Sequence, residues 1–306
     1  MTNYMKSSFL AHGKVILIGE HSVVYGYDAI ALPIKALNIR TTVEASTIMW
    51  MDTKQYHGPL ADAPSSYDGL KYVVATLCQK AEANEQLKIT YTGEIPIERG
   101  LGSSATVALG TAEALNEYFQ LKLTHAEIMA ITNHAEMINH GKASGLDAAT
   151  VSSDNLVYFN TKDGAQKLDN KLGATLLIMD TGQLGNTKEA VTMVRNKYDQ
   201  SVKVKNDIAR LGELTKLVKT AWLKKDAPAT GSYFDEAQVI LASLGLSTDH
   251  INQLQKIAQI NGALGFKLSG GGLGGVVIAL CTNQQVAEKI AHESQALIDN
   301  YWIEQI

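Results

Sequence analysis

Four stretches of this sequence carry side chains whose types and spacing could bind a phosphate, hold a metal ion or move a proton. The first, IPIERGLGSSATVALG, places Gly100, Gly102, Ser103 and Ser104 directly before a pattern typical of a helix. A helix N-terminus offers unpaired N–H groups and the positive end of its dipole, and glycine lets the backbone approach a bound group. The stretch is therefore a candidate phosphate cradle. An ordinary tight turn explains it equally well at this point, because short glycine motifs often match by chance.

Two further stretches contribute charged groups. In HGKVILIGEHSVVYG, Lys14 falls in a strand pattern, and Glu20 and His21 fall in the turn after it. In EMINHGKASGLDAAT, Glu136 lies near the end of a helical pattern and Asp147 follows a loop that contains glycine. Each also has a purely structural interpretation. Lys14 would be a solvated lysine at a strand edge, His21 a loop histidine that caps a backbone group, Glu136 a surface charge and Asp147 a helix N-cap.

The fourth stretch, KLSGGGLGG, lies between two strand patterns near the end of the chain. Five of the six residues 270–275 are glycine, which indicates a backbone that approaches a ligand or another loop. Neither common glycine fingerprint fits: the Gly-x-x-x-x-Gly-Lys-Ser/Thr pattern is absent, and a dinucleotide-binding loop should open the first βαβ unit of a domain. Together, the four stretches supply what phosphoryl transfer needs. They offer an N–H cradle, oxygen ligands for Mg²⁺, a lysine and an aspartate that can accept a proton.

The composition limits the classes of protein to consider. The 306 residues are 45% hydrophobic and 19% charged, which is typical of a packed protein with one large or two ordinary domains. The net charge of −4 argues against a general nucleic-acid surface but permits a local basic pocket. Cys78 and Cys281 lie far apart, which predicts two buried free thiols rather than a disulfide framework or a zinc site. With neither a signal-peptide pattern nor an apolar run of about 20 residues, we expect a soluble, cytoplasmic protein without a membrane partner.

Periodicity in the first half predicts four strands and two helices. The strand patterns cover residues 14–19, 29–34, 39–46 and 87–93. Apolar residues recur at helical spacing from 105 to 119. A second helix is expected at 124–141, because Thr124 and Glu127 form a capping-box signature and Gly141 suits the C-terminal cap.

The second half begins with a buried strand pattern at 174–182, followed by a pair of charged helices within 188–225. A helix at 249–260, strands at 265–270 and 275–281, a helix at 283–298 and a strand at 302–306 follow. Helices that flank short strands in this order predict a small α+β sandwich. A domain boundary near Gly173 would divide the chain into residues 1–172 and 173–306.

Three motifs carry a family resemblance that covers nearly the whole chain: GKVILIGEHSVVYG, PIERGLGSSATVALG and KLSGGGLGG. Their order resembles the kinase superfamily named for galactokinase, homoserine kinase, mevalonate kinase and phosphomevalonate kinase. Within it, the GEH–VVYG signature, EMINHGKASGLD and TGQLGNTKEAV are similar to the mevalonate kinase branch of the shorter bacterial kind. The family often has proline where this chain has His12 and Ala143. These two departures loosen turns but remove no chemical group.

The resemblance implies an α+β, two-domain small-molecule kinase fold. Residues 1–172 would form an N-terminal domain resembling a ribosomal-protein domain, with the phosphate loop and the metal and catalytic residues. Residues 173–306 would form a C-terminal ferredoxin-like domain with the substrate and glycine loops, and the active site would lie in the cleft. Asp147 would take a proton from the substrate hydroxyl, and Lys14 would stabilise the negative charge. Ser104 and Glu136 would bind Mg²⁺, a hard cation that prefers oxygen ligands.

The resemblance also implies two sets of binding residues. The substrate would be oriented by Glu20, His21, Thr187 and Gly271, with the glycine loop closing against the phosphate loop. ATP would contact Pro96, Ile97, Glu98, Arg99, Gly100, Leu101, Gly102, Ser103, Ser104 and Ala105.

The activity implied is ATP-dependent phosphorylation of the C5 hydroxyl of mevalonate to 5-phosphomevalonate, with Mg²⁺ as cofactor, in isoprenoid biosynthesis by the mevalonate pathway. One alternative is phosphomevalonate kinase, although the first half holds only two arginines, Arg40 and Arg99, for a second phosphate. The related decarboxylase lacks the lysine that corresponds to Lys14. A second alternative is a non-catalytic ligand-binding member of the fold. Such a protein would have lost one of four residues that are all present here: Lys14, Ser104, Glu136 and Asp147. The oligomeric state is left open, a homodimer being one option.

Overall fold

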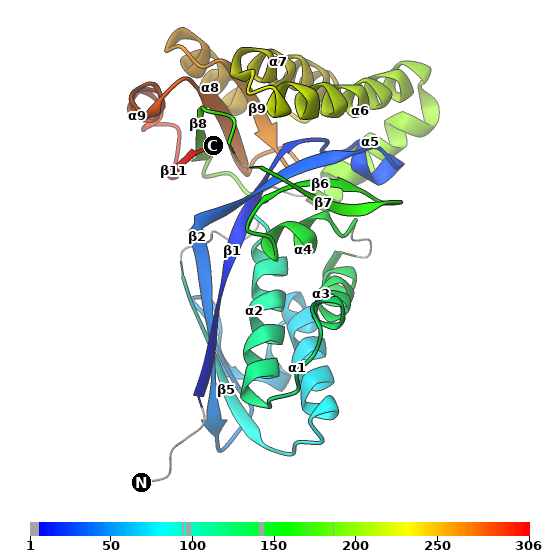
Figure 1. Ribbon diagram of the computed structural model, residues 1–306, viewed down its shortest axis with the longest axis vertical. Coiled ribbons are helices and arrows are strands. Elements are labelled where there is room, and N and C mark those ends of the chain that lie inside the picture. Colours follow the sequence, from blue (N-terminus) through cyan, green and yellow to red (C-terminus); the bar gives the residue numbers. More distant parts are fainter. Residues whose placement is uncertain (1–5, 94, 96–98, 141–143, 170, 186) are drawn as a thin grey trace. The chain divides into compact units, whose positions relative to one another are not determined.

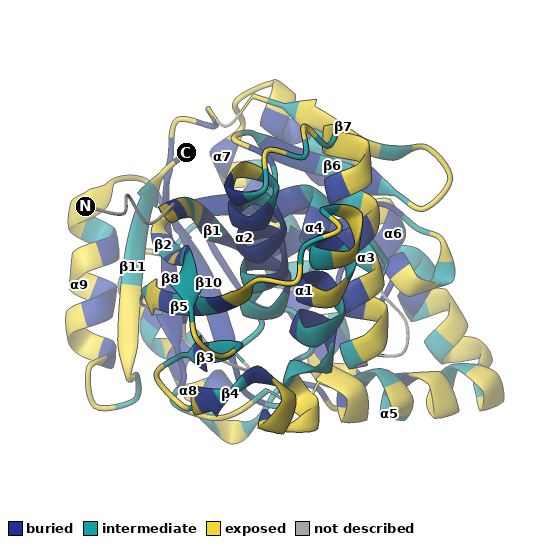
Figure 2. Ribbon diagram, turned by 90° about the horizontal axis from the view of Figure 1, so that it is seen from below, coloured by how far each residue is buried: buried dark blue, intermediate teal, exposed yellow. Residues whose placement is uncertain are grey.

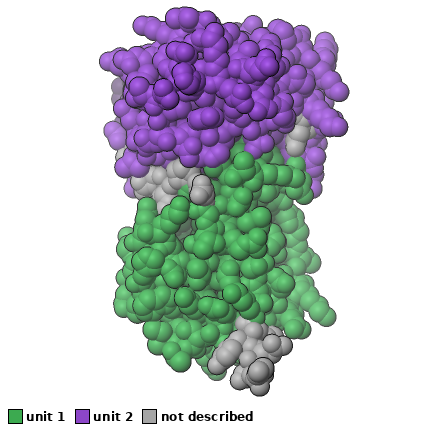
Figure 3. Space-filling view, turned by 90° about the vertical axis from the view of Figure 1, so that its left-hand side faces the viewer, with its two compact units in different colours: residues 1–14, 33–96, 102–154 green, residues 15–32, 97–101, 155–306 purple. Residues whose placement is uncertain are grey.

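The computed structural model describes residues 6–93, 95, 99–140, 144–169, 171–185 and 187–306. The chain forms two compact units, which Figure 3 shows in different colours. Unit 1 comprises Met1–Lys14, Pro33–Pro96 and Gly102–Asp154, and unit 2 comprises Val15–Leu32, Ile97–Leu101 and Asn155–Ile306. The predicted domain boundary near Gly173 stays a prediction. Among the described residues, no helix has the length and apolar character that a membrane span needs.

Unit 1 packs helices against an antiparallel sheet with one parallel pair. Its strand order is β4-β3-β5-β2, with β1 also paired to β2. In Figure 1 the helices α1, α2 and α3 lie along one face of these strands. Ser7 in β1 and Tyr91 in β5 fix the sheet to α2 through hydrogen bonds to Ala114 and Thr111. The strands are β1 (Lys6–Ile18), β2 (Ala29–Ser46), β3 (Trp50–Asp52), β4 (His57–Pro59) and β5 (Gln86–Gly93). The helices are α1 (Asp68–Lys80), α2 (Ser103–Tyr118), α3 (His125–His140) and α4 (Leu146–Val151), with 3-10 turns at Leu60–Asp62 and Ser65–Tyr67.

Strand β2 corrects one prediction. Residues 29–34 and 39–46 were expected as separate strands, but they belong to a single strand, Ala29–Ser46. Pro33 lies between the part that pairs with β6, Ala29–Ala31, and the part that pairs with β5, Ile39–Ser46. Proline has no backbone N–H, but at the strand edge that pairs with β6 and β5 no ladder hydrogen bond is lost, because Pro33 lies outside both paired parts.

Unit 2 contains a four-stranded sheet that is antiparallel throughout, in the order β11-β8-β10-β9. If the four strands are numbered in chain order, from β8 as strand 1 to β11 as strand 4, their order across the sheet is 4-1-3-2. This is the split βαβ order of a ferredoxin-like domain, so that prediction is confirmed. Strands β8 and β10 are buried along their whole length, whereas the residues of β11 are exposed or half-buried (Figure 2). The strands are β8 (Thr175–Asp180), β9 (Gly265–Ser269), β10 (Val276–Cys281) and β11 (Asn300–Gln305). The helices are α5 (Thr187–Gln200), α6 (Val202–Leu223), α7 (Ala227–Ser243), α8 (Asp249–Ile260) and α9 (Gln284–Ser294).

The rest of unit 2 is a small ladder and a turn. The beginning of β2 pairs with β6 (Leu156–Asn160), which pairs in turn with β7 (Gly164–Leu168). A 3-10 turn, Val23–Tyr25, follows β1. Strands β6 and β7 and helices α1, α4 and α7 are not among the predicted elements, and α9 ends at Ser294 rather than at 298. Cys281 is buried as expected, but Cys78 is only half-buried.

Candidate active site

Lys14 and Asp147 form an ion pair in unit 1. The Lys14 ammonium lies 3.0 Å from Oδ1 of Asp147, and the side chains are 2% and 40% exposed. The lysine stem runs against the predicted phosphate loop, residues 100–105, since a Cβ on Gly102 would come within 2.9 Å of Lys14 Cγ. Asp147 lies in the first turn of α4, where the helix dipole favours a carboxylate, and the N-cap is Gly145. The interpretations of Lys14 as solvated and Asp147 as N-cap are therefore wrong.

Ser104 and Glu136 form the second group of unit 1. Glu136 on α3 is buried, and the Ser104 hydroxyl at the start of α2 donates to its Oε1 at 2.5 Å. The pKa of Glu136 is raised to about 7, mainly by burial; the Ser104 hydrogen bond and the Lys14 charge oppose this rise, and the nearby Asp147 charge adds to it. Glu136 is thus no surface charge. These two oxygen atoms lie close enough for one cation to contact both.

Asn139, which the sequence patterns did not single out, fixes Ser104. Its side-chain amide donates to Ser104 Oγ at 3.0 Å, and its carbonyl oxygen accepts from the backbone N–H of Gly69 at 3.0 Å. Asn139 lies three residues after Glu136 in α3, so both side chains lie on one face of the helix. That spacing is the signal that could have found it.

The phosphate loop has the backbone that its glycines predict. Gly102 is the N-cap of α2 with φ of 76°, and it gives the first turn no side-chain cap. The helix begins at Ser103, and Ala105 is buried. In unit 2, Gly100 has φ of 80° and Leu101 is buried. Pro96, Ile97 and Glu98 lie outside the described residues.

Arg99, predicted to bind ATP, is held by two carboxylates of unit 2. Its guanidinium lies 3.3 Å from Asp180 at the end of β8 and 3.5 Å from Asp299. The glycine loop lies beside it, because a Cβ on Gly275 would approach the Arg99 carbonyl to 2.8 Å. Arg99 therefore ties the start of the phosphate loop to the C-terminal sheet.

Three of the predicted substrate residues meet in unit 2. His21 has a left-handed φ of 60°, and its Nε2 lies 2.9 Å from the Gly271 carbonyl. Burial lowers the pKa of His21 to about 4, so the ring is neutral near pH 7 and Nε2–H is the donor. A Cβ on Gly271 would come within 2.9 Å of Thr187 Cα. His21, Gly271 and Thr187 thus form one small cluster.

Glu20, the fourth, points into the protein. Its carboxylate pairs with the ammonium of Lys267 on β9, and the two side chains are 2% and 0% exposed. Burial raises the pKa of Glu20 and lowers that of Lys267, and each charge opposes the shift of the other. Lys267 is a further residue that sequence reasoning did not assign, although it opens the KLSGGGLGG motif.

The comparisons with known proteins identify the family. The family of GHMP kinases N terminal domains matches residues 69–154, and that of GHMP kinases C terminal domains matches residues 207–298. A mevalonate kinase from Pyrococcus furiosus is 32% identical over 92% of this chain and 91% of the relative. The chain belongs to the GHMP kinase family. It is a kinase.

Solved structures show the same likeness over the full length. The mevalonate kinase of methicillin-resistant Staphylococcus aureus is 30% identical, with a TM-score of 0.77, over 98% of this chain and 99% of that one. The L. major mevalonate kinase, solved in complex with R-mevalonate, has a TM-score of 0.83 over 100% and 99% of the chains. At 23% identity, the latter shows the fold alone.

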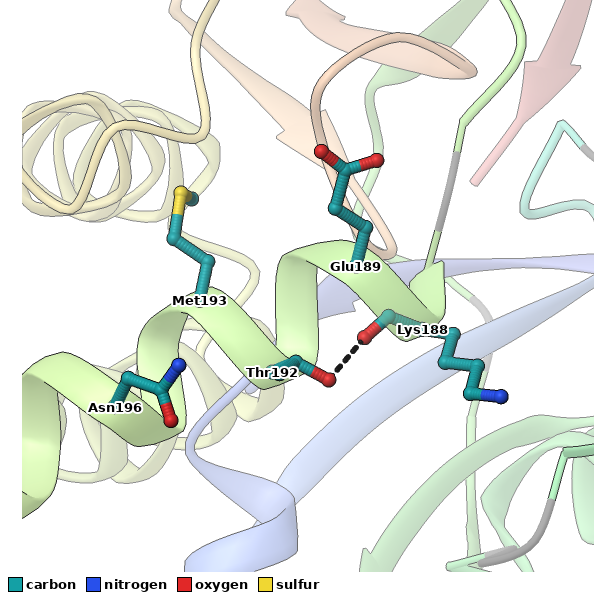
Figure 4. Close-up of a pocket in the computed structure, with 5 residues that line it drawn as sticks. All are labelled: Lys188, Glu189, Thr192, Met193 and Asn196. Carbon is teal, nitrogen blue, oxygen red and sulfur yellow. Dashed lines mark hydrogen bonds between the residues drawn. The ribbon is translucent and has the colours of Figure 1, made fainter.

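A hollow lies along α5 of this GHMP kinase, next to Thr187 in the sequence. It has a volume of about 570 Å³ and is lined by Lys188, Glu189, Thr192, Met193 and Asn196 (Figure 4). The Thr192 hydroxyl donates to the Lys188 carbonyl at 2.7 Å within the helix. All five lining residues come from this one helix, and we assign the hollow no chemistry.

Proposed function

We propose that this kinase transfers the γ-phosphoryl group of ATP to the C5 hydroxyl of mevalonate. Two observations support the substrate: the 32% identical Pyrococcus furiosus relative and the 30% identical Staphylococcus aureus structure are both mevalonate kinases. The observation that carries the chemistry is the Lys14–Asp147 pair, with a buried cation 3.0 Å from a half-exposed carboxylate.

Asp147 is the general base of the proposed reaction. A base must reach the hydroxyl that it deprotonates, and the Asp147 side chain is 40% exposed. Lys14 is buried beside it, so its charge acts on Asp147 through little water and is only weakly screened. In this arrangement Lys14 stabilises the negative charge that passes from Asp147 to the attacking oxygen.

Ser104 and Glu136 fit a magnesium ion. Mg²⁺ is bound in kinases by one or two protein oxygens together with substrate phosphates, and these residues offer a hydroxyl and a carboxylate. When bound, the ion neutralises charge on the phosphates. Ser104 also belongs to the first turn of α2, whose N–H groups we propose as the phosphate cradle.

The substrate end is formed by the GEH turn and the glycine loop. We assign Glu20, His21, Thr187 and Gly271 to the orientation of mevalonate. Because the Nε2–H of the neutral His21 ring is bound to Gly271, the ring offers Nδ1 as an acceptor for a substrate hydroxyl. The Thr187 hydroxyl can hydrogen-bond to either a hydroxyl or a carboxylate. The fold does not distinguish mevalonate from its phosphorylated product, since a phosphomevalonate kinase of Streptococcus pneumoniae shares it at 18% identity with a TM-score of 0.81.

The deciding experiment is an ADP-release assay with mevalonate, phosphomevalonate, galactose and homoserine at equal concentrations. We expect turnover with mevalonate to exceed turnover with each of the others, and to require Mg²⁺. Faster turnover of phosphomevalonate would overturn the proposal.

The base is tested by Asp147→Asn, which keeps the shape and removes the proton acceptor. We expect kcat to fall by about 10²–10⁴-fold, the range of a positioned general base, with ATP affinity within a few-fold of wild type. Lys14→Met should also lower kcat, and the two losses should not add in the double variant because both residues act on one proton transfer. If Asp147→Asn keeps more than about a tenth of the activity, Asp147 is not the base.

A further inference from the structure

Glu20 and Lys267 are charged residues with almost no contact with solvent. Their side chains are 2% and 0% exposed, and they pair across 247 positions of sequence. Lys267 Nζ also donates to the Leu268 carbonyl at 2.6 Å. Replacing a buried ion pair by apolar residues is often neutral or stabilising, so stability alone does not explain why charged residues occupy these two positions. The segments in which the two residues lie suggest another role.

The ion pair joins the two segments that carry His21 and Gly271, two of the proposed substrate residues. Glu20 precedes His21 in the GEH turn, and Lys267 begins the motif that continues into the glycine loop, residues 270–275. Two further contacts connect the same two segments. The His21 ring donates to the Gly271 carbonyl at 2.9 Å, and the Ser269 hydroxyl bonds both backbone groups of Ile16, at 3.0 Å to the N–H and 2.9 Å to the carbonyl.

The GEH turn needs such support because its backbone is strained. His21 has φ of 60°, a left-handed conformation that a residue with a side chain keeps only where its surroundings impose it. The turn is also closed by local hydrogen bonds, from the Ser22 N–H to the Glu20 carbonyl at 2.7 Å and from the Ser22 hydroxyl to the Gly19 carbonyl at 3.1 Å. These bonds shape the turn, but none of them reaches the glycine loop.

We propose that the Glu20–Lys267 ion pair is a positioning device, which holds His21 and the glycine loop in one arrangement so that both can orient the substrate. Glu20 and Lys267 then act through His21 and Gly271, so Glu20 contributes to the orientation of the substrate as a positioning residue, without touching it. The inference deepens the proposed function and rests on it, because it assumes that His21 and Gly271 contact mevalonate.

The test compares Lys267→Met, Glu20→Gln and the double variant carrying both changes. Each single variant leaves one buried charge or polar group without its partner, which lowers stability. The double variant removes both charges and should recover much of the lost unfolding midpoint. A pair that serves only stability would recover activity as well. A positioning pair would not, so we expect kcat/KM for mevalonate to stay about 10- to 100-fold below wild type in the double variant, with KM for ATP within about twofold.

A matched control is Asp28→Asn, another exchange of a buried carboxylate for an amide in the segment after the GEH turn. Asp28 accepts hydrogen bonds from the Tyr158 hydroxyl at 2.5 Å and from the side-chain amide of Asn160, both in β6. We expect it to lose stability and keep its KM for mevalonate. Two results would overturn the inference. One is a rise of the KM for mevalonate in Asp28→Asn as large as the rise in the ion-pair variants, and the other is full recovery of the wild-type kcat/KM in the double variant.

A readout without substrate separates this inference from the proposed function. In the wild-type protein the His21 Nε2–H is buried against Gly271, and its NMR signal should exchange slowly with water. In Lys267→Met and in the double variant, exchange should be much faster, and unchanged exchange in both would refute the positioning role. If exchange accelerates as expected but the wild-type protein does not turn over mevalonate, the proposed substrate is wrong and the tie between the two segments stands.

Discussion

At the scale of single residues, the Ser104 hydroxyl has a nearly complete set of partners. It donates its proton to Glu136 and accepts one hydrogen bond from Asn139, at 2.5 and 3.0 Å. A hydroxyl oxygen has two lone pairs, so one is left. We interpret the remaining lone pair as the one that faces the cation, with Asn139 fixing its direction.

The first prediction follows from this geometry and concerns Asn139→Ala. Without the amide donor, the Ser104 oxygen is free to turn, and a lost hydrogen bond of about 1 kcal/mol corresponds to about fivefold weaker binding. We expect the Mn²⁺ affinity, measured by electron paramagnetic resonance in the presence of a non-hydrolysable ATP analogue, to fall by that factor.

Asn116→Ala is the matched control for Asn139→Ala. Asn116 on α2 also accepts a hydrogen bond from a backbone N–H, that of Leu123 at 2.9 Å. Both variants therefore lose a bond between a side chain and the backbone, but only Asn139→Ala loses the contact with Ser104. Equal Mn²⁺ affinities in the two variants would reduce Asn139 to a structural residue.

The second prediction concerns the pH dependence of stability through His21. Its pKa is lowered from the ordinary 6.5 to about 4, mainly by burial; the hydrogen bond to Gly271 opposes this shift and the Lys267 charge adds to it. Between these two pH values the unfolded chain binds a proton that the folded protein does not, so the free energy of unfolding rises with pH across this window. The stability held above pH 6.5 is lost on acidification, by up to about 3 kcal/mol.

His21→Gln tests this dependence by urea unfolding at pH values from 4 to 7. Glutamine keeps an N–H donor for Gly271 and does not titrate, so the variant should show a flatter slope of stability against pH than wild type. Some slope should persist, because burial also lowers the pKa of His12. Equal slopes in the two proteins would show that His21 is not the neutral, buried group described here.

Residue type and spacing were enough to find Lys14, Asp147, Ser104 and Glu136 as chemical candidates, because each lies in a glycine-rich or helix-end stretch. They were not enough for Asn139 and Lys267. The role of Asn139 depends on Gly69 and Ser104, and that of Lys267 on Glu20, all distant in sequence. Which side chains meet across such separations is decided by tertiary packing, and no local pattern records it.

At the scale of elements, α7 holds the strand that carries Lys267. Strand β9 donates two backbone hydrogen bonds to side chains of α7, from the Phe266 N–H to Asp235 and from the Leu268 N–H to Gln238, both at 2.9 Å. Helix and strand come close together at Gly231 and Gly265, where an added Cβ on Gly231 would overlap the Leu264 backbone. Only glycine fits at that crossing.

The third prediction is that Gly231→Ala destabilises the protein. Alanine in a helix normally adds about 1 kcal/mol of stability relative to glycine. A lower free energy of unfolding in Gly231→Ala would therefore be the opposite of what helix propensity predicts. Overpacking against backbone costs about 1–3 kcal/mol or more, and we expect a net loss in urea unfolding. Ser232→Ala, at the exposed neighbouring position of α7, should change stability by less than about 0.5 kcal/mol.

The elements that the sequence predicted are those with long, regular patterns. The β8 and β10 runs, the α5–α6 pair and the capping box of α3 are all present, the last with the Thr124 N–H bonded to Glu127 at 2.9 Å. Helix α7 was missed because Pro228 and Gly231 in its first turns interrupt the helical pattern. Its N-terminal signal was nevertheless there, since Asp226 caps the helix and proline is favoured in a first turn. Strands β3 and β4 have only three residues each, too few to establish a period.

At the scale of the whole molecule, the chain passes between the two units five times, after residues 14, 32, 96, 101 and 154. Strands β1 and β2 each contribute residues to both units. Lys14, Ser104, Glu136 and Asp147 belong to unit 1, whereas Glu20, His21, Thr187 and Gly271 belong to unit 2. A pattern read along the sequence predicts a boundary at one position, and it cannot reveal such interleaving.

The last prediction is that the two units unfold together. Melting unit 2 would release residues 15–32 and so cut short β1 and β2, which the unit 1 sheet needs.

The three tryptophans allow a test by fluorescence, because Trp50 lies in unit 1 and Trp222 and Trp302 lie in unit 2. One variant, Trp222→Phe with Trp302→Phe, reports on unit 1 alone, and another, Trp50→Phe with Trp302→Phe, reports on the buried Trp222. Each variant's tryptophan signal should reach its urea midpoint together with that variant's own far-ultraviolet circular dichroism, as a two-state transition requires. A Trp50 transition displaced from the circular dichroism of the same protein would mean that unit 1 keeps its fold after unit 2 has lost its own, which the shared strands do not allow.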